Sequence, residues 1–275
     1  MSRFKSKLNF PAKYLYALIT SVYLFTLGVF HKRDRSLITT ICAHFGLRLE
    51  LSQPAKKIEP LVPEIDSSEI FSRDAEIRVL EPNAIAGNMS IFQMALISNL
   101  IHVHKPLRIF EIGTFDGRTT LNMVANAMSE TLVYTLDLPK SQLTSAHLPL
   151  GPEDDVYVNK DTSGTRFVGT KYANQVVQLY GDSATFDFSP YWNSIDLVFV
   201  DGAHSYEYAM NDSKIAMKLL RNGRGMILWD DYGNWDGVTR ALNELYSEGR
   251  EFAGLRRIKG TILAYLSIGL VDVGS

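Results

Sequence analysis

The chain has 275 residues, 46% of them hydrophobic and 21% charged, with one cysteine and a formal net charge of −2. This length can form one large core, or one domain with an N-terminal attachment. The near-neutral charge argues against a nucleic-acid-binding protein, and a single cysteine, Cys42, excludes an internal disulfide and a cysteine-based zinc site. Positive charge is concentrated in residues 1–60, which hold ten basic and three acidic residues, as in a basic leader beside an acidic body.

The first predicted element is a helix over residues 14–30, a stretch without charged residues. Basic residues flank it on both sides, at positions 5, 7, 13, 32, 33 and 35. At 1.5 Å per residue such a helix spans about 25 Å, short of the ~30 Å hydrocarbon core of a bilayer. Two interpretations stay open: a helix that packs against the catalytic domain or a partner subunit, and a membrane-anchoring or interfacial helix. No cleavage site follows, so we expect a cytoplasmic protein, with membrane association through this segment unresolved.

A domain boundary is predicted near residue 69. Residues 36–51 are typical of a short helix, and residues 52–68 contain three prolines among polar residues, which indicates a linker. We therefore divide the chain into an N-terminal helical segment with its linker, residues 1–68, and a catalytic domain, residues 69–275.

Strands and helices alternate through the catalytic domain. A helix over 88–104 comes first, and helices are then predicted at 117–128, 206–221 and 236–248. The predicted strands are 107–112, 132–138, 175–180, 195–200, 225–230, 254–259 and 261–268. This alternation predicts an α/β fold with a doubly wound, mostly parallel sheet of seven strands. The last two strands meet at a tight turn around Gly260, so the final strand is expected to be antiparallel.

A long connection, residues 139–174, separates the second and third predicted strands. It is rich in turn-forming and polar residues, and a connection of this length is usually functional or mobile. We expect acceptor selectivity to reside here and in the N-terminal segment. Its acidic residues Asp154, Asp155 and Asp161 are expected to be solvated.

Glycines and acidic residues follow the first three strands. Glu111, Gly113 and Gly117 lie at the first strand–helix turn, in a spacing that fits neither a dinucleotide fingerprint nor a phosphate-binding P-loop. Asp137 ends the second strand, where a carboxylate can accept hydrogen bonds from a ribose diol. Asp182 and Ser183 end the third strand, where they could meet an adenine amino group. Together these positions predict a cofactor crevice at the carboxyl edge of the sheet.

Three more carboxylates end the next two strands. Asp201 ends the strand at 195–200 and is followed by His204, while Asp230 and Asp231 end the strand at 225–230. Carboxylates held close together raise one another's pKa unless a cation lies among them, and oxygen ligands select a hard cation such as Mg²⁺. Two alternatives remain: Asp230 or Asp231 caps a helix or pairs with Arg, and His204 is a turn residue bonded to a backbone carbonyl.

Residues 85–270 resemble the class I S-adenosylmethionine-dependent methyltransferases. The resemblance runs through the segments "FEIGTFDG", "LDLP", "YGDS", "VFVDGAHSYE" and "MILWDDY", and it is strongest toward the catechol, caffeoyl-coenzyme A and macrolide-sugar O-methyltransferases. It implies a seven-stranded sheet with a reversed last strand. It also implies that the first motif holds the methionine part of the cofactor, that Asp137 holds the ribose, and that Asp182 and Ser183 hold the adenine. The cofactor residues of the first motif are Glu111, Gly113, Thr114, Phe115 and Gly117.

The predicted function is an S-adenosylmethionine-dependent O-methyltransferase, assisted by a divalent cation, that acts on a hydroxyl of a sugar, a glycan or a small natural product. Asp201 and His204 are the predicted catalytic residues, and either His204 or an Asp is the general base. Catechol-type relatives have Lys at the position of His204 and often Asn at that of Asp231. The alternatives are a non-catalytic nucleotide-binding module and, less favoured, an NAD-dependent oxidoreductase. No nucleic-acid partner is expected, and homo-oligomer formation stays open.

Overall fold

The computed structural model describes residues 10–31, 34–35, 37–38, 41–42, 57–151 and 154–270, apart from the side chains of residues 155 and 156. It contains two compact units, Met1–Lys57 and Ile58–Ser275. Residues 58–65, predicted to be part of the linker, belong to the second unit. The backbone N–H of Val62 donates to the Tyr232 hydroxyl at 2.9 Å, for example.

The first unit contains the helix α1, Phe10–Thr26, and a 3₁₀ turn at Gly28–Phe30. Leu24 on this helix packs with Ile38 and Cys42, and all three side chains are buried. Most of the predicted helix at 36–51 lies outside the described residues. Within the described part of the chain, no helix combines the length and the apolar composition needed to cross a bilayer.

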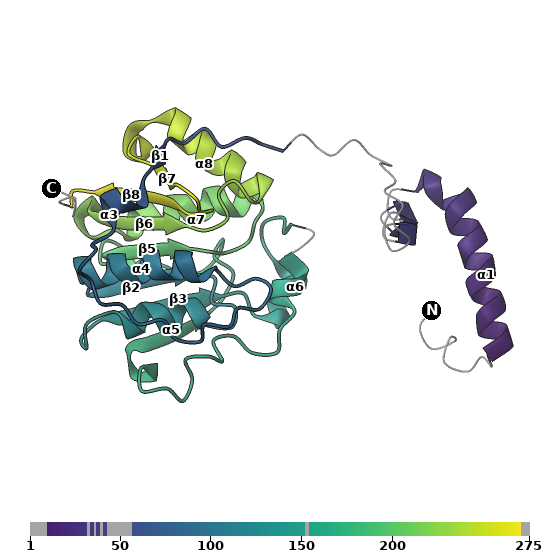
Figure 1. The fold of residues 1–275 in the computed structure, drawn as a ribbon, viewed down its shortest axis with the longest axis horizontal. Coiled ribbons are helices and arrows are strands. Elements are labelled where there is room, and N and C mark those ends of the chain that lie inside the picture. Colours follow the sequence, from purple (N-terminus) through teal and green to yellow (C-terminus); the bar gives the residue numbers. More distant parts are fainter. Residues whose placement is uncertain are drawn as a thin grey trace. The chain divides into compact units, whose positions relative to one another are not determined.

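The second unit is built on one eight-stranded sheet with the order β1-β7-β8-β6-β5-β2-β3-β4 (Figure 1). Its strands are β1 Glu64–Ile65, β2 Arg108–Ile112, β3 Leu132–Asp137, β4 Val176–Tyr180, β5 Leu197–Val200, β6 Gly225–Trp229, β7 Arg256–Ile258 and β8 Ala264–Ile268. Only β8 runs against its neighbours β6 and β7, and every other pairing is parallel. The predicted α/β fold and its antiparallel last strand are therefore confirmed.

The sheet has one strand more than predicted. The additional strand, β1, is only two residues long and pairs with β7 at the edge of the sheet. So short a strand leaves no periodic pattern in the sequence. The seven strands that the sequence did predict all form, and the turn around Gly260 joins β7 to β8 with a φ of +76° at that glycine.

The helices of this unit are α3 Ser67–Ile70, α4 Ile91–His104, α5 Arg118–Ala125, α6 Asp154–Val158, α7 Tyr206–Leu219 and α8 Asp236–Glu248. α4 and α5 pack on one face of the sheet, where Met94 and Val124 meet Ile109 and Phe199. α7 and α8 cover the other face.

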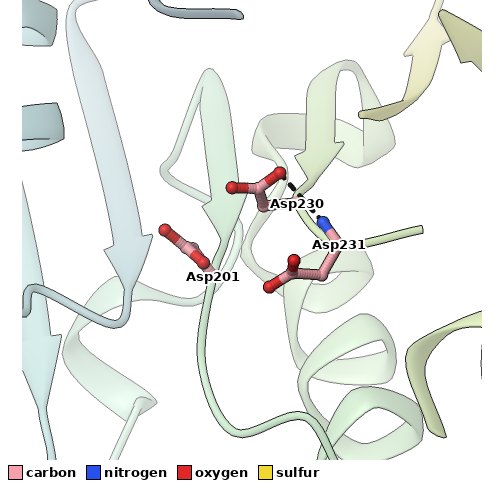
Figure 2. Close-up of side chains that lie close together, drawn as sticks. All are labelled: Asp201, Asp230 and Asp231. Atoms are coloured by element: carbon pink, nitrogen blue, oxygen red, sulfur yellow. Dashed lines mark hydrogen bonds between the residues drawn. The ribbon is translucent and has the colours of Figure 1, made fainter. Parts of the chain in front are cut away.

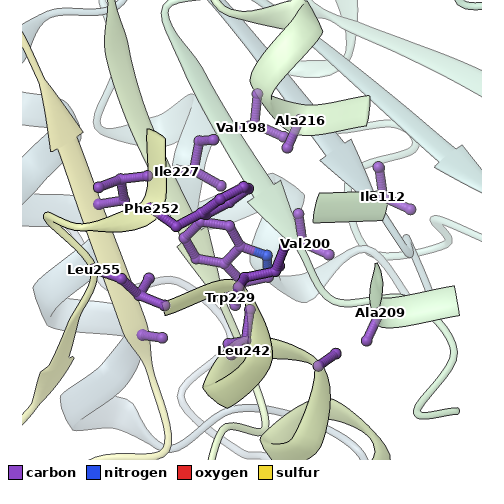
Figure 3. Close-up of a cluster of buried hydrophobic side chains, with 14 of the residues drawn as sticks. Ile112, Val198, Val200, Ala209, Ala216, Ile227, Trp229, Leu242, Phe252 and Leu255 are labelled. Carbon is purple, nitrogen blue, oxygen red and sulfur yellow. The ribbon is translucent and has the colours of Figure 1, made fainter. Parts of the chain in front are cut away.

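Trp229 of β6 lies at the centre of the core between the sheet and α7 and α8 (Figure 3). Its indole N–H donates to the Ser213 hydroxyl at 2.9 Å, so the ring is buried without an unsatisfied donor. Trp229 is 1% exposed, so it belongs to the core and is not available to a substrate at the edge of the sheet. Strands covered on both faces explain the short, continuously apolar segments in the sequence. The parallel strands also define the carboxyl edge of the sheet. The side chains predicted to be functional lie at this edge, where the strands end.

Candidate active site

The first strand–helix turn packs directly against the end of β5. Gly113 follows β2 with a φ of +98°, and a Cβ at this position would lie 1.8 Å from the backbone oxygen of Asp201. Only a residue without a side chain permits that approach. Gly113 therefore brings the turn after β2 and the turn after β5 together, and so places the predicted cofactor motif beside the predicted catalytic residues.

Two cavities open at this edge and share part of their walls. The first encloses about 610 Å³ and the second about 750 Å³ of space not filled by protein atoms, part of it open to solvent. Asp137, Asp182 and Ser183 line the first cavity only, and Asp230 and Asp231 line the second only. Both cavities are lined by Phe115, Tyr157, Asp201, Gly202 and His204. The arrangement suits two reactants that meet at a shared boundary.

Asp137 ends β3 at the wall of the first cavity, as predicted for a ribose ligand. Its Oδ2 accepts a hydrogen bond from the Ser163 hydroxyl and forms an ion pair with Lys160 Nζ at 2.8 Å. Both partners come from the connection between β3 and β4, which therefore folds over this side of the edge. The sequence did not assign a role to Lys160 or Ser163.

Asp182 and Ser183 line the same cavity beyond β4. Asp182 accepts hydrogen bonds from the Tyr208 hydroxyl at 2.9 Å and from the backbone N–H of His147 at 2.7 Å. The nearby carboxyl of Asp212 on α7 is 1% exposed, and its burial raises its pKa from 3.8 to about 7. Asp212 lies mid-helix in the sequence, so only the fold reveals it as part of this region.

Three residues of the first motif lie behind the cavity wall. Glu111 is fully buried, and its Oε2 accepts hydrogen bonds from the hydroxyls of Thr120 and Thr135, both at 2.5 Å. Burial raises the pKa of Glu111 to about 8. Thr114 bonds to Thr135, and Gly117 packs against the ring of Phe167. None of Glu111, Thr114 and Gly117 is among the described residues that line either cavity, whereas Gly113 and Phe115 line the first.

The three predicted metal ligands converge (Figure 2). Asp201, Asp230 and Asp231 each offer a carboxylate oxygen, and these oxygens lie within 4.8 Å of one another. Burial raises the pKa of Asp230 to about 8, with Asp231 as the next cause. Burial also raises the pKa of Asp201 well above its usual value, and the charges of Asp230 and Asp231 raise it further. Such mutual repulsion is what a bound cation relieves.

His204 lies between two carboxylates. Its Nδ1 is 2.5 Å from Asp154 Oδ1, and its Nε2 is 3.0 Å from Asp231 Oδ2. Burial alone would lower the pKa of His204, but the hydrogen bonds to Asp154 and Asp231 outweigh it and raise the pKa to about 9. At neutral pH the ring is therefore an imidazolium that donates from both nitrogens. The ring also stacks on Trp235, with centroids 4.8 Å apart.

The expectation that Asp154 is solvated was wrong. Asp154 begins α6 within the connection between β3 and β4, is 2% exposed, and also accepts from the backbone N–H of Gly151 at 2.6 Å. Asp161 of the same connection is solvated as expected, with a side chain 94% exposed. The side chain of Asp155 lies outside the described residues.

Two further residues support the site and were missed. Gln93 of α4 donates to Asp230 Oδ1 at 3.1 Å. Arg118 of α5 is buried, and its guanidinium donates to the backbone oxygens of Glu81, Pro82 and Met89. It thereby holds the segment 81–89, part of which lines the second cavity. Neither residue carries a sequence motif, because each acts through contacts between distant segments.

The sheet order and the edge site together define a class I methyltransferase fold. Comparison with known families agrees: residues 110–232 match the family model described as a methyltransferase domain. The match supports the predicted class, an S-adenosylmethionine-dependent methyltransferase, over this part of the chain. It favours this class over the two alternatives, a non-catalytic nucleotide-binding module and an NAD-dependent oxidoreductase.

Individual relatives are distant. An uncharacterized protein of Acanthamoeba polyphaga mimivirus is 29% identical over 149 residues, which cover 52% of this chain and 60% of that protein. The chain thus matches only about three fifths of the length of this curated relative. Solved structures similar to this chain include the O-methyltransferase TomG of Streptomyces achromogenes, which is involved in tomaymycin synthesis and was solved with SAM. That structure is 18% identical with a TM-score of 0.46, over 66% of this chain and 82% of that one.

Another similar structure is the SAH-bound methyltransferase PaMTH1 of Podospora anserina. It is 19% identical with a TM-score of 0.45, over 65% of this chain and 79% of that one. At this level of similarity neither structure indicates the acceptor or the metal requirement of this chain.

Proposed function

We propose that this chain is an O-methyltransferase that transfers the methyl group of S-adenosylmethionine to a hydroxyl of a neutral, polyhydroxylated acceptor, with a divalent cation held by three aspartates. One observation carries the proposal. Asp201 and His204 line both the cavity with the cofactor-type side chains and the cavity with the acidic cluster. A donor in the first cavity and an acceptor in the second would meet at these residues.

Asp137, Asp182 and Ser183 are the residues we assign to the nucleoside part of the donor. Both described contacts of Asp137 go to Oδ2, so a ribose hydroxyl would approach Oδ1. Gly113 and Phe115 form the wall toward Asp201 and would face the methionine part. S-adenosylmethionine supplies an activated methyl group on a sulfonium sulfur, and the chain has to orient the acceptor oxygen toward it.

Asp201, Asp230 and Asp231 are the residues we assign to the cation. Three carboxylate oxygens within 4.8 Å of one another form a hard, all-oxygen ligand set, and burial together with the charge of Asp231 raises the pKa of Asp230 to about 8. A divalent cation there would favour the ionised form of an acceptor hydroxyl. The contact from Gln93 orients Asp230 within the cluster.

We assign His204 to positioning rather than to proton abstraction. Both of its nitrogens already face carboxylates, and its pKa is raised to about 9. A general base must accept a proton near neutral pH, which an imidazolium with two hydrogen-bonded N–H groups does not do. A carboxylate of the cluster is therefore the proton acceptor that we propose, and His204 holds Asp231 in place.

The lining of the second cavity favours a neutral acceptor. The aromatic residues Phe115, Tyr157 and Trp235 and the amide residues Asn88 and Asn234 are among those that line it. No Lys or Arg side chain is among the described residues that line this cavity, and its acidic cluster repels anions. Aromatic faces with nearby amides suit a sugar or a related polyol. For a phosphorylated or carboxylated acceptor, the one cationic side chain among the described lining residues is His204, which is already paired with Asp154 and Asp231.

The test is a methyl-transfer assay with labelled donor and Mg²⁺ on matched pairs of acceptors, such as an alkyl glucoside and its 6-phosphate. We expect transfer to the neutral member of each pair, with at least tenfold lower kcat/KM for the phosphorylated member. Asp230→Asn should remove most of the activity. A preference for the anionic acceptor would refute the acceptor assignment, and full activity with excess chelator would refute the role of the cation.

A further inference from the structure

The exposed surface of α1 is mostly apolar. Nearly every large side chain from Phe10 to Phe25 is exposed, for example Leu15 at 57%, Ile19 at 61% and Val22 at 59%. Lys13 is the only charged residue in the helix. Leu24, near its C-terminal end, packs with Ile38 and Cys42. A helix with so much exposed apolar surface is unstable in water and requires an apolar partner.

The hydroxyl groups of α1 do not require water or a polar partner, because their hydrogen bonds are satisfied within the helix. Thr20 donates to the backbone oxygen of Tyr16 at 2.8 Å, and Ser21 donates to that of Ala17 at 2.9 Å. Thr26 donates to the backbone oxygen of Val22 at 2.6 Å. Hydroxyls satisfied within their own helix can enter an apolar medium without an unpaired donor.

Charge favours a lipid surface over a second copy of the chain. Basic residues stand at positions 5, 7 and 13 before the apolar stretch and at 32, 33 and 35 after it. The nearest acidic residue in the sequence, Asp34, accepts a hydrogen bond from Tyr23 at 3.3 Å. Two copies would bring like charges together at both ends, whereas anionic lipid headgroups attract both clusters.

The length of the helix determines how it can meet a bilayer. Its 17 residues span about 25 Å at 1.5 Å per residue, less than the ~30 Å of a hydrocarbon core. The helix therefore fits along one surface better than across the bilayer, and we expect both basic clusters on the same side. We propose that α1 embeds along one surface of a membrane that contains anionic lipids, with both basic clusters at the headgroups of that surface.

The experiment is co-sedimentation of the full-length protein with vesicles of phosphatidylcholine, with or without phosphatidylserine. We expect binding to the mixed vesicles that weakens in high salt, and little binding to phosphatidylcholine alone. Ile19→Glu should lower the vesicle partition coefficient at least tenfold, since it puts a charge where an apolar side chain enters lipid. Lys13→Glu, which reverses one charge, should lower it about fivefold or more.

The matched control is Val168→Glu, because Val168 is an equally exposed apolar residue, at 67%, in the catalytic unit. This variant should bind vesicles as the unmodified chain does, and circular dichroism of all variants shows whether they remain folded. Equal binding by Ile19→Glu and the unmodified protein would overturn the proposal. So would an oligomer, measured by sedimentation without lipid, that Ile19→Glu dissociates while vesicles bind neither protein.

Discussion

Asp154 and His204 lie 50 residues apart in the chain, yet Asp154 Oδ1 is 2.5 Å from His204 Nδ1. The other ring nitrogen of His204 lies 3.0 Å from Asp231 Oδ2. A carboxylate thus holds an imidazolium, which in turn holds a second carboxylate in the acidic cluster. The first carboxylate belongs to the connection between β3 and β4, so this connection takes part in building the site.

Asp154→Asn should lower kcat ten- to a hundredfold, as the loss of an orienting partner does at comparable sites. Asn keeps the shape of the side chain but not its charge, so the His204 ring loses its ionic partner and Asp231 loses its fixed orientation. We expect the KM for the acceptor to change less than about threefold, because Asp154 is not among the described residues that line the second cavity. Steady-state kinetics that separate kcat from KM provide the measurement.

Asp161→Asn is the control for this change. Asp161 lies in the same connection, but its side chain is 94% exposed and pairs with Lys140. Unchanged kinetics are expected, since exposed ion pairs contribute little. If Asp154→Asn also left kcat unchanged, or if both variants reduced it equally, the positioning role of Asp154 would be wrong.

The sequence predicts this site where side chains follow directly from strand ends. Asp137, Asp201, Asp230 and Asp231 could be placed at one edge because parallel strands align their carboxyl ends. Glu111 shows the limit of that reasoning: it lies within β2, where its side chain meets Thr120 and Thr135 behind the cavity wall. Strand alternation does not specify such neighbours.

Contacts that close over the edge were not predictable. Asp154 and Lys160 occur in a polar connection whose composition indicates only a loop, and their burial depends on how that loop folds over the strands. A local pattern carries no information about a contact across 50 residues. The role of Arg118 was not predictable for the same reason. Its position in a helix has no distinguishing pattern, and its partners lie in the distant segment 81–89.

Mg²⁺ should raise the melting temperature of the protein. A ligand at a hundred times its Kd adds about 2.7 kcal/mol to the free energy of unfolding, or roughly 5–10 °C for a domain of this size. Asp230→Asn should behave differently in two respects. It removes part of the repulsion that raises the pKa of Asp201, so it should be more stable than the unmodified chain without metal, and it should gain little from Mg²⁺.

Differential scanning calorimetry with Mg²⁺ and with a chelator measures both effects. Asp187→Asn serves as the control, because Asp187 is exposed and caps the backbone N–H of Ser189 away from the cluster. This variant should show the same rise in melting temperature with Mg²⁺ as the unmodified chain. An increment of equal size in Asp230→Asn would show that the ion binds somewhere else.

Stability should fall as pH rises from about 4 to about 7, in part because of Asp212. Burial raises the pKa of this carboxyl from 3.8 to about 7, so the folded state binds the proton more tightly than the unfolded state. The stabilising contribution is complete below pH 4 and is lost as pH rises through 7. Fully expressed, the shift corresponds to roughly 4 kcal/mol, an upper bound.

Asp212→Asn removes the titration and keeps an amide in the same space. We expect the variant to exceed the unmodified chain in free energy of unfolding by about 1–3 kcal/mol at pH 8. The difference should shrink as pH falls toward 4. Denaturant unfolding at several pH values tests this, with Asp161→Asn as the control that should show no such trend. A constant difference across the pH range would assign the effect to packing instead of titration.

Gly113→Ala tests the close approach on which the site depends. A Cβ at Gly113 would lie 1.8 Å from the backbone oxygen of Asp201, so β2 and β5 would have to separate at the point where both cavities meet. Gly169→Ala is the matched control, because its φ is +76° and no atom lies within 4 Å of the added Cβ. The control isolates the cost of a left-handed backbone, about 1–2 kcal/mol.

Gly113→Ala should cost several kcal/mol more in free energy of unfolding and should abolish methyl transfer even where the variant remains folded. Equal unfolding free energies for the two variants would mean that the turns after β2 and β5 can separate without consequence, and the shared boundary between donor and acceptor would lose its structural basis.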